Sequence, residues 1–214
     1  DAYPNQQVTL IYTIYTNVNV QYQGFEEEPD LKGFWVEEIT DKKLLNREEV
    51  FINGTRYAKA EIRKVALFPT KPGTYEIRPG SIRCSVRKMQ RQNDMVDSFF
   101  DDSFFGSALL ARREPRLLET KPVTITVRPF PEENKPAGFT GTCGEFRLHA
   151  ALDATSVPQH EPVTLTVSIE GKGNIDTIER PLFSHTPEFR VYERDTTTDM
   201  RKDEAVIQGT KTFT

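Results

Sequence analysis

Cysteine is scarce in this chain, as are histidine, long apolar runs and clustered basic residues. Its 214 residues include two cysteines, Cys84 and Cys143, which allow one disulfide bridge at most and exclude a disulfide framework. No apolar run approaches the ~18 residues of a membrane-spanning helix. The net charge is −4 and acidic residues interrupt the basic ones, which excludes the dense Lys and Arg surface that binds nucleic acid.

Motifs that carry catalysis or bind a cofactor are also missing. The three histidines, His149, His160 and His185, are far apart in the chain, whereas metal ligands usually come in closely spaced groups. The stretch 171–174, GKGN, lacks the third glycine of a dinucleotide loop and the Lys-Ser/Thr pair of a P-loop. No nucleophile motif of the form G-x-S-x-G occurs. We therefore predict a protein that is not an enzyme, with no catalytic residue, no cofactor and no metal ion.

The chain does contain a repeated alternation of apolar and polar residues, which is typical of strands with one buried face. It runs through residues 8–15, where every second side chain is apolar, and it recurs in 123–128, 146–152 and 163–170. Helical periodicity is almost absent. We therefore predict an all-β fold made of immunoglobulin-like β-sandwiches.

The turn residues favour the same fold class. Asn53-Gly54 stands between two strand-like segments and predicts a hairpin, because a type I′ turn needs positive φ at both central residues. The run 69–73, PTKPG, predicts the end of one strand and the start of the next. Tyr75 then has the position of a tyrosine corner, whose hydroxyl binds nearby backbone. The alternative is a tyrosine that only packs on the sheet.

The segment 8–55 recurs without a gap 155 residues further along the chain. The 48 aligned positions contain 11 identities, where common residue frequencies give about three by chance. The chain therefore holds a tandem repeat of one module. The identities are Val8, Thr9, Leu10, Ile14, Asn19, Phe34, Val36, Glu38, Glu49, Gly54 and Thr55 with Val163, Thr164, Leu165, Ile169, Asn174, Phe189, Val191, Glu193, Glu204, Gly209 and Thr210.

The repeat divides the chain into two modules. We place the first at residues 1–128 and the second at 137–214, joined by a connector at 129–136 whose three prolines should keep the modules at a fixed angle. Cys84 and Cys143 fall in different modules, so we expect two buried thiols, with a bridge as the alternative.

The second module is predicted to be truncated at its C-terminal end. The repeat aligns its first strand, 145–152, with positions that would lie before Asp1. The strands that follow Thr55 in the first module have counterpart positions beyond Thr214, about four strands in all. An incomplete sandwich exposes apolar side chains and unpaired strand edges.

One segment, 88–118, interrupts the strand pattern as an aromatic insert. It is too long for a hairpin loop and too aromatic to remain solvated, so it forms either a structural patch or a docking surface for a partner. Residues 106–113 are compatible with a short helix. Clustered aspartates at 97, 101 and 102 leave calcium as a less favoured alternative. The tentative docking residues are Phe99, Phe100, Phe104 and Phe105.

The only tryptophan, Trp35, lies in the strand-like stretch 33–36, GFWV. Its alternating neighbours favour packing in the core or between sheets. The alternative is a platform for a sugar ring, which would make the chain a carbohydrate-binding β-sandwich module at the cell surface. Burial or exposure of Trp35 distinguishes the two interpretations.

Short motifs spread over almost the whole chain resemble those of one family. They are 33–35 (GFW), 53–57 (NGTRY), 67–73 (LFPTKPG), 99–105 (FFDDSFF), 135–141 (KPAGFTG), 171–175 (GKGNI) and 189–192 (FRVY). On these residues the chain resembles the BatD family, the bacterial aerotolerance or oxygen-tolerance proteins. It departs from the family at Thr142-Cys143, where small apolar residues are usual.

The resemblance implies tandem immunoglobulin-like modules on the periplasmic face of the bacterial inner membrane, membrane-anchored by a helix outside this fragment. It also implies protein partners: von Willebrand factor A-domain proteins, tetratricopeptide proteins and, indirectly, a MoxR-type AAA+ ATPase. The family's role lies in stress tolerance or envelope integrity, and it has no catalytic residues to carry over. We therefore predict a non-enzymatic periplasmic scaffold for protein-protein interaction.

Overall fold

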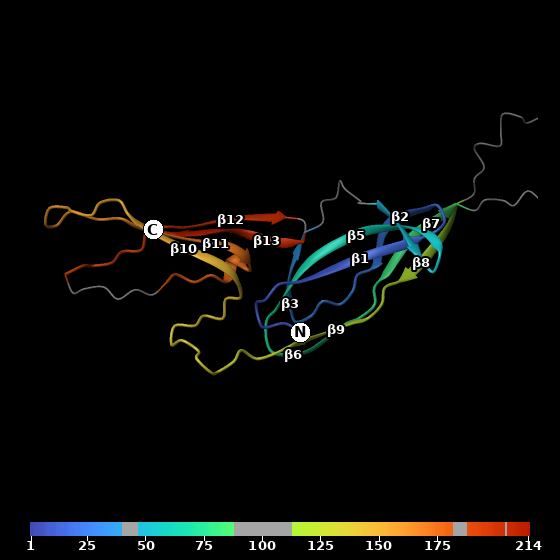
Figure 1. Cartoon of the computed structure of the whole chain (residues 1–214), viewed down its shortest axis with the longest axis horizontal. Helices are drawn as coiled ribbons and strands as arrows, with labels where there is room; N and C mark the ends of the chain where they lie inside the picture. Colours follow the sequence, from blue (N-terminus) through green and yellow to red (C-terminus); the bar gives the residue numbers. More distant parts are fainter. Residues whose placement is uncertain (40–46, 88–112, 182–187, 204) are drawn as a thin grey trace, which may run out of the picture.

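The computed structural model describes residues 1–39, 47–87, 113–181, 188–203 and 205–214. Two groups of strands follow one another along the long axis of the molecule (Figure 1). β1 to β9 form the first module and β10 to β13 the second, and the one helical element in the described ranges is the 3-10 turn η2, Ile175–Thr177. The fold is all-β with antiparallel sheets, as predicted.

The first sheet of module one is built around β5. β1 pairs along one side of β5, and β3 and β4 share its other side, all antiparallel. Asn53 and Gly54 have φ angles of 50° and 77° in the turn between β4 and β5, as the predicted type I′ hairpin requires. The bounds are β1 Val8–Thr16, β3 Phe34–Glu38, β4 Arg47–Ile52 and β5 Thr55–Pro69.

The strands that face this sheet form two smaller groups. β2, β7 and β8 make a three-stranded sheet, while β6 pairs with β9 and Ala2 bridges β9 in parallel. The predicted insert, 88–118, extends too far at its C-terminal end, because residues 113–118 belong to β8. Pro115 conceals this strand in the sequence, and the sheet accepts a proline there because β8 is an edge strand. The bounds are β2 Val20–Glu27, β6 Gly73–Ile77, β7 Ser81–Arg87, β8 Arg113–Glu119 and β9 Val123–Val127.

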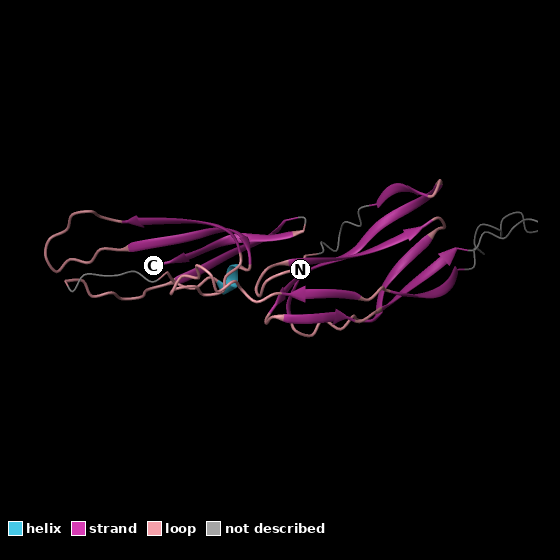
Figure 2. Cartoon of the chain, turned by 60° about the horizontal axis from the view of Figure 1, so that its bottom comes forward, coloured by secondary structure: helices cyan, strands magenta, loops and turns pink. Residues whose placement is uncertain are grey.

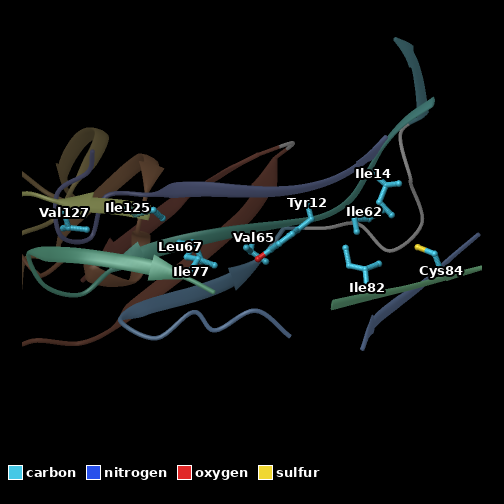
Figure 3. Close-up of a cluster of buried hydrophobic side chains, with 10 residues drawn as sticks. All are labelled: Tyr12, Ile14, Ile62, Val65, Leu67, Ile77, Ile82, Cys84, Ile125 and Val127. Carbon is cyan, nitrogen blue, oxygen red and sulfur yellow. The ribbon is translucent and has the colours of Figure 1, made fainter. Parts of the chain in front are cut away.

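The core of module one lies between these two layers (Figure 3). β1 and β5 contribute to it from one layer, and β6, β7 and β9 from the other, so the module is a two-layered sandwich. Burial of each large aliphatic side chain contributes about 1.5–3 kcal/mol. Its buried side chains are Tyr12, Ile14, Ile62, Val65, Leu67, Ile77, Ile82, Cys84, Ile125 and Val127.

Tyr75 forms the predicted tyrosine corner. Its hydroxyl donates a hydrogen bond of 2.8 Å to the carbonyl of Lys71, four residues upstream. Its ring packs against Phe34, with 5.0 Å between the ring centroids. Gly33 has a φ of 90°, and a Cβ there would lie 2.2 Å from the Tyr75 ring. The ring of Tyr75, at the start of β6, therefore packs against Gly33 and Phe34 at the start of β3.

Module two has a single sheet in its described residues, with the antiparallel order β10-β11-β13-β12. Figure 2 shows this sheet as one layer of strands, with loops and the short helix on one side of it. Residues 189–192, which the repeat aligns with 34–37 of module one, form no strand. The bounds are β10 Gly144–Leu152, β11 Leu165–Gly173, β12 Thr196–Asp203 and β13 Val206–Phe213.

The two modules share part of their topology. β11, β13 and β12 occupy the places that β1, β5 and β4 have in module one. The gap-free alignment does not extend through the hairpin, because module one turns after Ile52 while module two turns after Asp203. That turn is four residues earlier than an offset of 155 requires. Gly209 and Thr210 therefore lie within β13 and not at its turn.

Candidate interaction surfaces

The free edge of β1, called here the β1 edge, is an open surface of module one. β1 pairs with β5 on one side, and no strand of the described part lies on the other. Its nine residues, VTLIYTIYT, include no charge and no proline, two features that commonly protect an edge strand. Ile11 and Tyr15 are exposed on the outer face of the sheet. The β1 edge can therefore accept a further strand through its backbone N–H and C=O groups.

Module two shows what kind of strand this geometry accepts. The same edge of β11, the counterpart of β1, is covered by β10 over its whole length. β10 places Phe146 and Leu148 on one face and Arg147 and His149 on the other. An antiparallel strand with alternating apolar and polar residues therefore fits the β1 edge.

Trp35 is exposed, so the prediction that it packs in the core or between sheets is wrong. The side chain is 59 % exposed, and its indole nitrogen donates to the Glu37 carboxylate at 3.2 Å. Alternation along β3 turns Phe34 and Val36 toward the inner layer and leaves Trp35 on the outer face. The side chains of β3 do alternate between the two faces of the sheet, as predicted. The sequence does not show which of these faces packs against the second sheet.

The four phenylalanines of the insert lie outside the described residues. Phe99, Phe100, Phe104 and Phe105 remain a predicted docking surface, and the aspartates at 97, 101 and 102 also lie outside the described residues. The helix suggested for 106–113 also lies there, apart from Arg113, which opens β8.

Module two docks on the outer face of the β1–β5–β3 sheet through the turn between β12 and β13. The side-chain amide of Gln7 donates to the Ala205 carbonyl at 2.8 Å and accepts from the Ile207 N–H at 2.9 Å. The Thr9 hydroxyl donates to the same Ala205 carbonyl at 2.7 Å. Two outward side chains at the start of module one therefore bind the backbone of the turn.

Apolar and ionic contacts widen this joint between the modules. Phe68, on the outer face of β5, is 2 % exposed and belongs to one buried cluster with Ile207 of β13. Lys202 donates to the carboxylate of Glu37 at 3.1 Å and to the carbonyl of Glu38 at 2.7 Å. These contacts join the outer face of module one to module two.

The segment between the modules is also packed. Phe130 stacks on Tyr3 with 5.7 Å between ring centroids, and it meets Phe139 edge-on at 4.9 Å. The side-chain amide of Asn5 donates to the Gly141 carbonyl at 3.1 Å. Phe130 of the connector therefore packs against one aromatic ring from each module, Tyr3 and Phe139.

Titratable groups do not assemble into a reactive centre in the described ranges. No group of three or more His, Cys, Asp or Glu side chains there could hold a metal ion. His149 is exposed on β10, and His160 lies in a turn with a φ of 75°. Cys84 and Cys143 are free cysteines in different modules. Burial raises the pKa of both thiols, which disfavours the nucleophilic thiolate.

A shallow hollow of about 690 Å³ lies on the outer face of module two. It is lined by three acidic and three basic side chains, so it offers no net charge to select a ligand. These side chains are Glu145, Arg147, Glu170, Lys172, Asp199 and Arg201.

Comparison with protein-family models, curated proteins and solved structures finds no match to this chain. No helix in the described ranges has both the length and the apolar character that crossing a membrane requires. Functional inference therefore rests on the surfaces themselves: the β1 edge, the exposed Trp35 and the joint between the modules.

Proposed function

We propose that this chain is a non-enzymatic scaffold that presents β-sandwich modules to protein partners. The β1 edge carries the proposal, because a long, uncharged strand with one edge that no described strand covers is the feature that strand addition by a partner requires. The contacts across the joint between the modules support it, since a scaffold with packed modules sets the direction in which its binding surface points.

The resemblance to the BatD family supports a more specific form of this proposal. In that form the chain belongs to a membrane-anchored aerotolerance protein on the periplasmic face of the bacterial inner membrane. Its partners are von Willebrand factor A-domain and tetratricopeptide proteins, and indirectly a MoxR-type AAA+ ATPase. The role is stress tolerance or envelope integrity. No cofactor and no nucleic acid takes part.

Ile11→Lys tests the β1 edge, because a lysine on an edge strand opposes pairing with another strand. We expect capture of a purified von Willebrand factor A-domain partner to fall at least about tenfold, which corresponds to roughly 1.4 kcal/mol of binding free energy. Ile52→Lys is the matched control, since Ile52 is 41 % exposed against 40 % for Ile11 but lies on β4. Equal capture by both variants contradicts binding at the β1 edge.

The insert provides a separate prediction. Replacing Phe99, Phe100, Phe104 and Phe105 together with serine should lower the melting temperature if the rings form a structural patch, because each buried ring contributes roughly 2 kcal/mol. Unchanged melting with loss of partner capture identifies a docking surface. If neither melting nor capture changes, both interpretations of the insert are wrong.

A carbohydrate-binding module is the second candidate, and the exposure of Trp35 favours it. None of the ring pairs in the described residues includes Trp35. Trp35 is the only tryptophan, so its fluorescence reports directly on a sugar stacked on it. Saturable quenching by cell-wall oligosaccharides, lost in Trp35→Phe by calorimetry, supports this function. Absence of binding rejects it.

A further inference from the structure

The stretch of chain that contains β1 carries no charge. Residues 2–25 include no Asp, Glu, Lys or Arg, although these residue types make up 28 % of the sequence. On an edge strand that binds a different protein, a charge is matched by an opposite charge on the partner. On a strand that pairs with its own copy across a two-fold axis, a charge near the axis meets the same charge of the copy. The lack of charge therefore favours a second copy of this chain as the strand at the β1 edge.

The backbone of β1 leaves alternate residues free to pair. The Ile39 N–H donates to the Lys64 carbonyl at 3.0 Å, so Lys64 directs its backbone groups toward β3. The next residue of β5, Val65, directs its groups toward β1, where it lies opposite Leu10. The bulge in this ladder adds its extra residue to β5 and leaves the alternation of β1 intact. The residues of β1 whose N–H and C=O groups point to the free edge are therefore Thr9, Ile11, Thr13 and Tyr15.

β1 matches itself in the antiparallel register that pairs all nine of its residues, with Tyr12 on the two-fold axis. In this register Thr9 of one copy lies opposite Tyr15 of the other. Ile11 lies opposite Thr13 in the same way. Each residue with free backbone groups thus meets another such residue, and each of these pairs exchanges two N–H···O=C bonds.

The same register covers the exposed apolar side chains of β1. Ile11 is 40 % exposed and Tyr15 is 51 % exposed on the outer face of the sheet. Across the two-fold axis, Ile11 of one copy is the diagonal neighbour of both Ile11 and Tyr15 of the other, within reach of long and aromatic side chains. Apolar side chains from the two copies therefore gather into one cluster and shield one another from water.

A hollow between the modules lies where this register places Tyr15 of the second copy. The hollow has a volume of about 360 Å³, and Thr9 and Val206 are among the residues that line it. No residue of β5 lines it, so it opens on the free side of β1. Directly opposite residues of an antiparallel pair project to the same face, so Tyr15 of the second copy projects beside Thr9 toward the hollow. The joint between the modules thus offers space for a ring that is exposed in the single chain.

We propose that two copies of this chain pair through their β1 edges, antiparallel and with Tyr12 on the two-fold axis. The two sheets built around β5 then form one continuous sheet, and Tyr15 of each copy occupies the hollow between the modules of the other. This inference rests on the proposed function, because it names a second copy as the strand that occupies the β1 edge when no other partner does. The interface is isologous, so it closes at two copies.

Two opposite charges test this arrangement. Ile11→Lys and Thr13→Glu each place the same charge twice near the axis, so each variant alone should self-associate at least about tenfold more weakly in sedimentation equilibrium. Mixed in equal amounts, the two variants bring opposite charges face to face, and the mixture should associate within about threefold of the parent chain. Both side chains lie on the outer face and not in the core, so the fold is kept. Ile52→Lys, on β4, is the control and should associate like the parent.

A parent chain that stays monomeric at every accessible concentration overturns the proposal. So does a dimer that Ile11→Lys leaves intact, or one that the mixture of charged variants fails to restore. Capture of the von Willebrand factor A-domain partner tests the proposed function separately. A monomeric parent chain that still captures this partner through the β1 edge refutes the dimer alone. A dimer that Ile11→Lys disrupts and the mixture restores supports this inference even where capture of that partner fails.

Discussion

We expect Gly33→Ala to lower the free energy of unfolding by about 2–5 kcal/mol. The substitution strains the backbone at residue 33, and its methyl group also clashes with the Tyr75 ring. Gly33 has a φ of 90°, in the region that disfavours any residue with a Cβ. The new methyl group would also lie 2.2 Å from the Tyr75 ring, which the hydrogen bond to Lys71 holds in place. Urea denaturation of the variant and the parent chain measures the difference.

Gly54→Ala is the matched control for this prediction. Its φ of 77° carries the same backbone strain, but no atom lies within 4 Å of the added Cβ. We expect it to cost about 1–2 kcal/mol, so the excess in Gly33→Ala measures the clash with Tyr75. Equal losses in the two variants would show that the tyrosine corner yields to the methyl group and does not restrain the chain before β3.

Features of the fold that depend on neighbouring residues could be predicted from the sequence. The turn at Asn53-Gly54 needs two positive φ angles, and these residue types supply them wherever the strands lie. The tyrosine corner spans four residues, from Lys71 to Tyr75, so its hydrogen bond is local. The alternation in β1 and β9 likewise identified the faces that enter the core.

Features that depend on distant partners could not be predicted in the same way. Alternation in β3 divides Trp35 from Phe34 but does not say which of the two faces the second layer. Phe189 repeats Phe34, which lies in β3 opposite Pro69, yet Phe189 forms no strand. Pro115 hides β8, since only its place at the edge of a sheet makes a proline acceptable.

The contacts between the modules could not be predicted from sequence patterns either, because they also join residues that are distant in the chain. Gln7 and Thr9 are typical of a solvated strand edge, and nothing near them in the chain indicates that Ala205 is their partner. Phe68 is an apolar residue on the outer face of β5. The sequence shows that it interrupts the alternation of apolar and polar residues, but it does not show that a second module covers it. Contacts of this kind follow from how two folded modules meet.

Phe68→Ala should weaken that joint and lower the free energy of unfolding by about 3–5 kcal/mol, the usual range for truncating a buried phenylalanine. For a chain of this size the melting temperature should fall by roughly 10 °C. The cavity opens between the modules, beside Ile207, and not in the core between the two layers of module one. Module two should therefore lose its fixed orientation while both modules keep their sheets.

Phe51→Ala separates this effect from the general loss of a phenylalanine. Phe51 lies on β4 of the same sheet but is 73 % exposed, so its truncation should change stability by no more than about 0.5 kcal/mol. Small-angle scattering should show a broader range of molecular dimensions for Phe68→Ala than for Phe51→Ala or the parent chain. Destabilisation by Phe68→Ala with unchanged scattering would show that Phe68 stabilises module one alone. The polar contacts of Gln7 and Lys202 would then determine the angle between the two modules.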